Sequence, residues 1–91
     1  MNLKFSAGRL VATPAALQAL AESGQTPDFF LQKHLSGDWG DVDDEDRLLN
    51  EEALRNGTRL LSAYKTLNGI RLWIITEADR SSTCILKPEE Y

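Results

Sequence analysis

The apolar positions in the first half of the chain recur with helical spacing behind two similar start signals. Thr13-Pro14 and Thr26-Pro27 each place a hydroxyl side chain at the N-cap and a proline at the first helical position. We therefore expect a first helix over Ala15–Ser23 that ends at Gly24, with one face formed by Leu17, Leu20 and Ala21. A second helix is expected from Pro27 to Ser36-Gly37, with apolar positions at Phe30, Leu31 and Leu35.

An acidic loop and a third helix are expected next. Asp38–Asp46 has the composition of a loop, with Trp39-Gly40 in its middle. Asp43 is placed to cap a helix, and the acids that follow it would lie where the helix dipole favours negative charge: Asp44, Glu45 and Asp46. An i, i+4 pattern supports this helix at Leu48, Leu49, Glu52 and Ala53, and Asn56-Gly57 ends it.

After residue 57 the pattern becomes that of strands. Leu60–Thr66 and Ile70–Glu77 flank Leu67-Asn68-Gly69, where Asn68-Gly69 predicts a hairpin with a two-residue type I′ turn. A third strand is expected over Thr83–Leu86 and ends before Pro88. Arg9–Ala12 is interpreted either as a further short strand that joins this sheet or as an extended lead-in to the first helix.

A two-residue turn would fix which side chains share a face of the sheet. It pairs Tyr64 with Trp73, and a second connection centred on Asp79-Arg80 places Cys84 opposite Ile75. One face then carries Leu61, Ala63, Leu72, Ile74 and Ile85, and the other carries Leu60, Tyr64, Trp73, Ile75, Cys84 and Leu86. Three short helices can cover only one of these apolar faces, so either the helices wrap around the sheet or the second face meets another protein.

The expected fold class is α+β: three short N-terminal helices packed on a small antiparallel sheet, formed mainly by a C-terminal three-stranded meander. The 91 residues suffice for one domain, residues 1–91, and 42% apolar with 26% charged residues is ordinary for a globular protein. No apolar run approaches the roughly 18 residues of a membrane span, and the first residues lack a signal-peptide pattern, so a cytoplasmic location is expected.

The negative charge is concentrated in one stretch. Ten basic and fourteen acidic residues give a formal net charge of −4, and six of the acids lie in residues 38–46, which contain no base. Without a Lys/Arg stripe, direct nucleic-acid binding is not expected. The stretch also lacks the alternating spacing of a calcium loop, so no metal is assigned to it. It is either a partner-binding surface, for example one that mimics nucleic-acid phosphates, or a solvated loop with helix-capping acids.

Few side chains are candidates for catalysis. His34, the only histidine, lies near the end of the second helix, and the sequence allows either a structural or a catalytic role for it. The connection from Glu77 to Ser82 offers a carboxylate and a guanidinium for acid–base work and phosphate binding. Alternatively, Asp79 and Ser81 satisfy backbone donors while Arg80 pairs with Glu77. The chain has no phosphate-binding loop, HExxH, CxxC or nucleophile elbow, so no cofactor is expected.

Two aromatic side chains are candidates for binding. Tyr64 and Trp73 are expected to form a cross-strand pair, and the neighbouring Arg71 and Thr66 suggest a binding surface as an alternative to core packing. Cys84, the only cysteine, cannot form a disulfide within the chain and is expected to be a small buried apolar side chain.

Two resemblances bear on function. The blocks Ser36–Asp41, Leu72–Thr83 and Leu86–Tyr91, with Val11–Pro14, resemble short proteins carried on bacterial plasmids and integrative elements, sometimes labelled plasmid-related proteins. That resemblance implies a setting on mobile DNA and carries no established activity. The order of helices before a hairpin entered through Gly57–Leu61 is also similar to the RelE/barnase-like ribonuclease toxins, which are typically basic, whereas this chain is acidic.

These observations favour a non-enzymatic accessory or inhibitor protein of a mobile element. Inhibition of a host defence system is one form that this role can take. It would bind another protein, from the host or the element, or a second copy of itself. The expected contacts are Asp38, Trp39, Asp41, Asp43, Asp44, Tyr64 and Trp73. The alternative is a metal-independent ribonuclease in which Arg80 and Arg71 neutralise phosphate and Glu77 or His34 transfers the proton.

Overall fold

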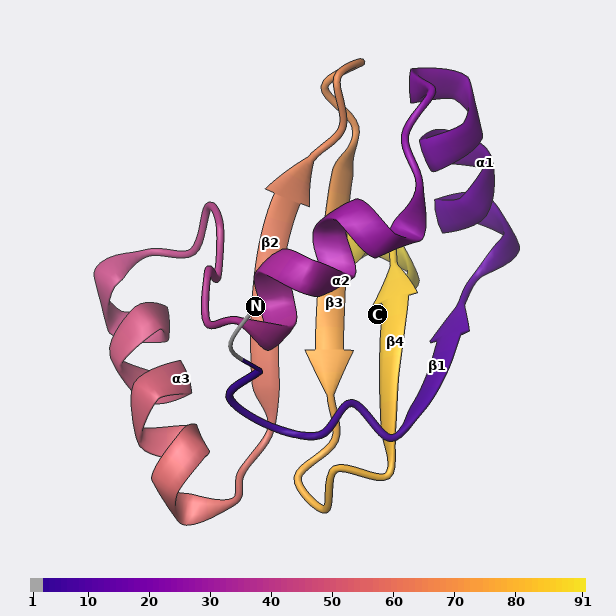
Figure 1. The fold of residues 1–91 in the computed structure, drawn as a ribbon. Coiled ribbons are helices and arrows are strands. Elements are labelled where there is room, and N and C mark those ends of the chain that lie inside the picture. The colour runs from indigo at the N-terminus through magenta and orange to yellow at the C-terminus, as the bar shows by residue number, and fades with distance from the viewer. Residues whose placement is uncertain (1–2) are drawn as a thin grey trace.

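The computed structural model describes residues 3–91 and has three helices on a four-stranded sheet (Figure 1). The elements in chain order are β1 (Arg9–Ala12), α1 (Pro14–Ser23), α2 (Pro27–Leu35), α3 (Asp44–Asn56), β2 (Leu60–Lys65), β3 (Arg71–Thr76), β4 (Ser82–Leu86) and a 3₁₀ helix η1 (Pro88–Glu90). The expected α+β class is confirmed. Within residues 3–91 no helix is long and apolar enough to cross a membrane.

The sheet has the strand order β1-β4-β3-β2. Strands β2, β3 and β4 pair antiparallel, as the meander predicts, but β1 joins the sheet and runs parallel to β4. The sheet is therefore mixed and wider than the expected three-stranded meander. Thr13, at the end of β1, caps α1 by accepting a hydrogen bond from the Ala16 N–H at 3.1 Å. The short parallel strand thus leads directly into the first helix.

The helices occupy one face and one edge of the sheet. In Figure 1, α2 crosses in front of the strands, α1 lies beyond the end of β1, and α3 lies alongside β2. The main core forms between α1, α2 and the sheet, from Ala16, Ala19, Leu20, Phe30, Leu31, Tyr64, Leu72, Ile74 and Ile85. In α1, however, Leu17 and Ala21 are exposed, so the predicted apolar face is only partly right: Ala16 and Ala19 join Leu20 instead.

The hairpin between β2 and β3 differs from the expected two-residue turn. Leu67 and Asn68 lie at the centre of a turn closed by the Gly69 N–H and the Thr66 carbonyl at 2.9 Å, and Gly69 has a φ of +81°. Such a turn adds a left-handed glycine beyond its two central residues, which shifts the register by one. Tyr64 therefore pairs with Leu72, not with Trp73, and the predicted Tyr64–Trp73 pair is wrong.

A one-residue shift moves every side chain of β2 to the other face. Leu60, Ser62 and Tyr64 of β2 point toward the helices, together with Leu72, Ile74, Thr76, Thr83 and Ile85. The opposite face carries Leu61, Ala63, Trp73, Ile75, Cys84 and Leu86. The predicted register between β3 and β4 is confirmed, with Ile75 opposite Cys84 and Ile74 opposite Ile85.

Candidate functional site

The acidic loop is held to the fold by its tryptophan. Trp39 points inward and is only 3% exposed, and its indole N–H donates to Glu51 Oε2 at 2.8 Å. Its ring stacks on Phe5, with centroids 6.2 Å apart, and makes a T-shaped contact with His34, with centroids 5.8 Å apart. Trp39 is therefore an anchor of the loop, which corrects its expected place on an exposed binding surface.

The loop also pairs with the outer edge of β2, the side that faces away from β3. The Ala63 N–H donates to the Trp39 carbonyl at 3.0 Å, and the Asp41 N–H donates to the Ala63 carbonyl at 2.6 Å. Gly40, between them, has a φ of +76°, and a Cβ there would lie 2.1 Å from the Ala63 carbonyl oxygen. Only glycine fits this approach. The loop is consequently fixed against the sheet while the side chains of Asp38 and Asp41 remain exposed.

The neighbouring position on the same edge is covered by α3. The Asn50 side chain donates to the Leu61 carbonyl at 2.7 Å, and its oxygen accepts from the Leu61 N–H at 3.0 Å. A side-chain amide here takes the place of another strand, so this sheet edge offers no free template for a further chain. The side of α3 that faces the sheet is therefore formed by its two buried residues, Asn50 and Ala53.

The leucines of α3 therefore lie on its outer side. Leu48 is 64% exposed and Leu49 is 55% exposed. They follow Glu45 at i+3 and i+4, and Glu52 follows at i+7, so the four side chains share one strip of the helix. We call Glu45, Leu48, Leu49 and Glu52 the α3 surface. Two large apolar groups there are exposed to water between two carboxylates.

Negative charge surrounds the α3 surface. The Asp43 carboxylate caps the helix by accepting from the Asp46 N–H at 2.8 Å, and both Asp43 and Asp44 are exposed. Residues 38–56 contain eight acidic and two basic residues, a net of six negative charges, whereas the remaining residues carry six acidic and eight basic ones. The acids have a capping role at one end of the helix, and they also give this side of the molecule a field that attracts positive charge.

Tyr64 and Trp73 lie on opposite faces of the sheet. Tyr64 is buried against Phe30, with ring centroids 5.3 Å apart, and its hydroxyl donates to the Asp38 carbonyl at 2.5 Å. Burial raises the pKa of the Tyr64 hydroxyl. Trp73 is half-buried on the face away from the helices, where its ring meets the Tyr91 ring at 5.7 Å. The two do not form the joint binding surface predicted from the sequence.

His34 lies at the centre of a buried chain of hydrogen bonds. Its Nδ1 is 2.5 Å from Ser62 Oγ and its Nε2 is 2.9 Å from Thr76 Oγ1. Thr76 Oγ1 lies 2.7 Å from Thr83 Oγ1, and the Thr83 hydroxyl donates to the Ala7 carbonyl at 2.8 Å.

The carbonyl at the end of this chain fixes the direction of each bond from His34 Nε2 onward. Thr83 gives its only proton to Ala7, so Thr76 must donate to Thr83 and must accept from Nε2–H of His34. The low pKa of the buried ring makes the imidazole neutral at pH 7, so Nδ1 carries no proton and accepts from the Ser62 hydroxyl. Burial lowers the pKa of His34 to about 4. Because His34, Ser62, Thr76 and Thr83 are all fully buried, this chain ties α2 to three strands and has no route to a substrate.

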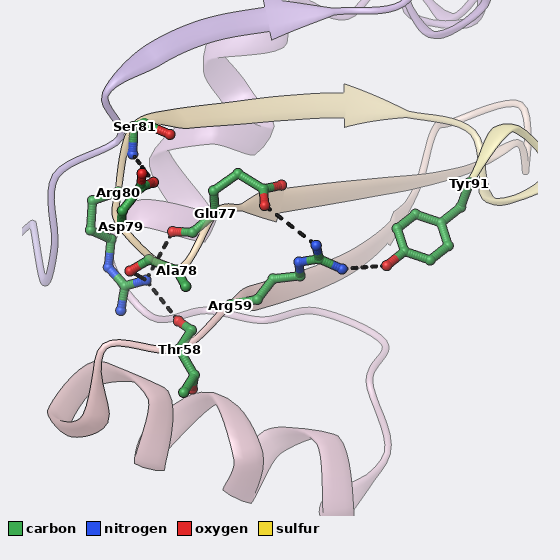
Figure 2. A network of polar contacts seen from close by, with 8 residues as sticks. All are labelled: Thr58, Arg59, Glu77, Ala78, Asp79, Arg80, Ser81 and Tyr91. Carbon is green, nitrogen blue, oxygen red and sulfur yellow. Dashed lines mark hydrogen bonds and ion pairs between the residues drawn. The ribbon is translucent and has the colours of Figure 1, made fainter.

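The remaining residues of the ribonuclease hypothesis do not converge. Figure 2 shows that Glu77 faces Arg59, whose guanidinium lies 3.4 Å from Glu77 Oε1 and also donates to the Tyr91 hydroxyl. Arg71 begins β3 and Glu77 follows its end, a separation of about 20 Å at 3.3 Å per residue. His34 is enclosed in the core.

Arg80 is occupied by backbone carbonyls. Its guanidinium donates to the carbonyl oxygens of Thr58 (2.7 Å), Ala53 (2.9 Å), Glu77 (3.1 Å) and Ala78 (3.2 Å). Figure 2 draws Arg80 with three of these residues, Thr58, Glu77 and Ala78. Of the alternative that gave this connection a structural role, the Asp79 part is confirmed, since the Ser81 N–H donates to Asp79 Oδ1 at 2.9 Å. The Arg80 side chain, however, contacts the Glu77 backbone and not its carboxylate. Arg80 therefore joins the end of α3 to the β3–β4 connection.

Comparison of the chain with protein families, with curated proteins and with solved structures found no match. Among residues 3–91, no group of three or more His, Cys, Asp or Glu side chains is placed to hold a metal ion.

The sequence did not point to Asn50 or to the outward leucines, although the i, i+3, i+4, i+7 spacing from Glu45 to Glu52 is visible in it. The α3 surface is where two exposed leucines coincide with the acidic stretch of the chain.

Proposed function

We propose that this chain is a non-enzymatic protein-binding accessory or inhibitor of a mobile genetic element, and that it binds its partner through the α3 surface. The observation that carries the proposal is the outward position of Leu48 and Leu49, 64% and 55% exposed, on a helix whose inward side is formed by Asn50 and Ala53. Small domains ordinarily use leucines to build the core, and an exposed apolar cluster with a polar rim is typical of a contact surface.

Charge supports the class of partner. Eight acids against two bases in residues 38–56 favour a partner surface rich in lysine and arginine, with an apolar centre that receives Leu48 and Leu49. The rim carboxylates of Asp38, Asp41, Asp43 and Asp44 would accelerate encounter more than they would tighten the complex. Buried Trp39 and Tyr64 would contribute by fixing the loop, without touching the partner.

The setting on a mobile element rests on the resemblance to plasmid and integrative-element proteins described above. In that setting the partner is a protein of the host or of the element, and an inhibitory role against host defence is one form of this proposal. A basic protein whose cleft normally receives nucleic acid has the chemistry that the acidic surface requires.

The test is recovery of a partner with matched variants. The tagged wild-type chain, the Leu48→Ser/Leu49→Ser variant and a Leu17→Ser control would be used to capture proteins from host lysate, with and without nuclease treatment. Leu17 is 46% exposed on α1, away from the acidic stretch, and so controls for loss of an exposed leucine.

We expect a stoichiometric protein that resists nuclease and is lost only with the Leu48/Leu49 variant. Equal capture by all three proteins would refute the role of the α3 surface. Recovery of RNA or ribosomes that disappears on nuclease treatment would support the ribonuclease alternative, for which growth arrest on induction, relieved by substitution of the exposed Arg71 with alanine, is the further test.

A further inference from the structure

The edge of the sheet opposite α3 is formed by β1, and no other strand within residues 3–91 pairs with its outer side. In β1, the Arg9 N–H donates to the Ser81 carbonyl at 2.9 Å, and the Thr13 N–H donates to the Ile85 carbonyl at 3.0 Å. Backbone groups of a strand point alternately to its two sides, so those of Arg9, Val11 and Thr13 face β4. The N–H and C=O groups of Leu10 and Ala12 consequently point away from the sheet, and Figure 1 shows β1 at its margin.

The two edges are treated differently by the fold. On β2, the outward groups of Leu61 and Ala63 are bound by Asn50 and by the loop at Trp39–Asp41. On β1, Leu10 is 53% exposed and Val11 is 41% exposed. Lysines, prolines and bulges commonly protect edge strands, and β1 contains none of these. An apolar edge with free hydrogen-bonding groups is a template for another strand.

We propose that this strand is β1 of a second copy of the chain, paired antiparallel about a twofold axis at Val11. In this register Leu10 lies opposite Ala12 of the second copy, and these are the residues whose backbone groups point outward. The two symmetric pairs exchange four hydrogen bonds. The sheets of the two copies join into one continuous sheet of eight strands, with the α3 surfaces at its two far ends.

Charge complementarity between Arg9 and Glu90 favours a second copy of the chain as the partner and antiparallel pairing as the orientation. Arg9 lies opposite Thr13 of the second copy, and the Thr13 hydroxyl already donates to Glu90 Oε1 at 2.8 Å. Arg9, Val11 and Thr13 alternate onto the face that lies away from the helices, so Arg9 of each copy comes beside the Glu90 carboxylate of the other. The Lys87 N–H, which donates to Glu90 Oε1 at 2.8 Å, lowers the pKa of that carboxyl and keeps it ionised. Parallel pairing in register would instead place two Arg9 side chains side by side.

A disulfide across the axis tests the register directly. Val11 faces Val11 of the second copy as a pair without mutual backbone hydrogen bonds, for which the Cα–Cα distance is about 4.5 Å, within the range that a disulfide spans. The Val11→Cys substitution is made with Cys84→Ser, because Cys84 is the neighbour of Val11 in β4. Leu17→Cys with Cys84→Ser is the control, a cysteine of similar exposure on α1.

Under mild oxidation we expect the Val11→Cys protein to form a covalent dimer at least ten times faster than the control, at equal concentration. Equal rates for the two proteins would overturn the proposal. Both rates are measured on native protein and read on denaturing gels without reductant, so they do not depend on the function of the α3 surface.

Sedimentation equilibrium gives an independent test without cysteines. We expect the wild-type mass to rise from 10.2 kDa toward twice that value over a concentration series. Leu10→Pro removes an N–H that points away from β4, a position that an edge strand tolerates, so this variant is expected to stay monomeric with an unchanged circular dichroism spectrum. A wild-type chain that remains at 10.2 kDa throughout would refute the dimer, whatever the behaviour of the variant.

Discussion

The buried histidine makes stability depend on pH in a way that can be isolated. His34 is neutral in the folded protein, where burial lowers its pKa to about 4, and in the unfolded chain it has the ordinary value of 6.5. Between these values the unfolded state binds one more proton than the folded state, so stability falls as the pH falls. The loss is about 1.4 kcal/mol per pH unit, or about 3 kcal/mol in all, and it is complete at about pH 4.

The His34→Gln variant removes this dependence. A glutamine amide supplies one donor and one acceptor in the core but does not titrate. At pH 7 we expect the variant to be less stable by about 1–3 kcal/mol, because at least one of the hydroxyls of Ser62 and Thr76 loses an ideal partner. As the pH falls from 6.5 to 4, the difference between the two free energies of unfolding shifts by about 3 kcal/mol in favour of the variant, which then equals or exceeds the wild-type protein in stability.

The assay is urea denaturation followed by tryptophan fluorescence, with both proteins at pH 7, 6, 5 and 4. Every carboxylate is common to the two chains, so its contribution cancels in the difference between their free energies of unfolding. A difference that stays constant over this range would show that His34 does not release a proton on folding. The Ser62-to-Nδ1 hydrogen bond that we assign to the neutral form of His34 would then run in the opposite direction.

Three further predictions concern stability, each measured by urea or thermal denaturation. Asn50→Ala should cost about 1–3 kcal/mol, since both backbone groups of Leu61 lose their partner; an unchanged midpoint would show that water replaces the amide without loss. Arg80→Ala should cost at least about 2 kcal/mol, and Arg80→Gly should be about 1 kcal/mol more stable than Arg80→Ala, because residue 80 has a φ of +61°. Gly40→Ala should cost more than about 2 kcal/mol through contact with the Ala63 carbonyl, and a wild-type melting temperature would contradict that geometry.

Local signals predicted the helices well because each boundary depends on nearby residues. Thr13 and Asp43 cap their helices through side-chain oxygens, and Gly24 and Gly57 end them in the left-handed conformation. Thr26 makes no side-chain hydrogen bond to α2. Of the Thr26-Pro27 start signal, only Pro27 therefore acts as expected.

The register of β2 needed information from the rest of the fold. Asn68-Gly69 is compatible with a two-residue turn and with a longer turn that ends in a left-handed glycine. The longer turn places Leu60 and Tyr64 on the face that the helices cover, and that gain depends on residues far away in sequence. The error carried over to the predicted site, because it placed Tyr64 beside Trp73 on one surface.

The features that define the candidate site were hidden for a related reason. Asn50 acts on Leu61 across eleven positions, and the His34 chain joins residues up to 76 positions apart. Each of these side chains is ordinary in its own segment, and only the folded arrangement gives it a partner. The acidic stretch, by contrast, is local, and its exposed Asp38, Asp41, Asp43 and Asp44 were predicted from composition alone.

The central claim is that Leu48 and Leu49 are contact residues, and the dissociation constant of the captured partner tests it most directly. Full burial of a leucine contributes about 1.5–3 kcal/mol, and these two begin at 64% and 55% exposed, so burying what remains is worth about 2–3 kcal/mol for the pair. By isothermal titration we predict that Leu48→Ser/Leu49→Ser weakens binding about 30- to 150-fold and that Leu17→Ser leaves it unchanged. Equal dissociation constants for the wild-type protein and the Leu48/Leu49 variant would contradict the account.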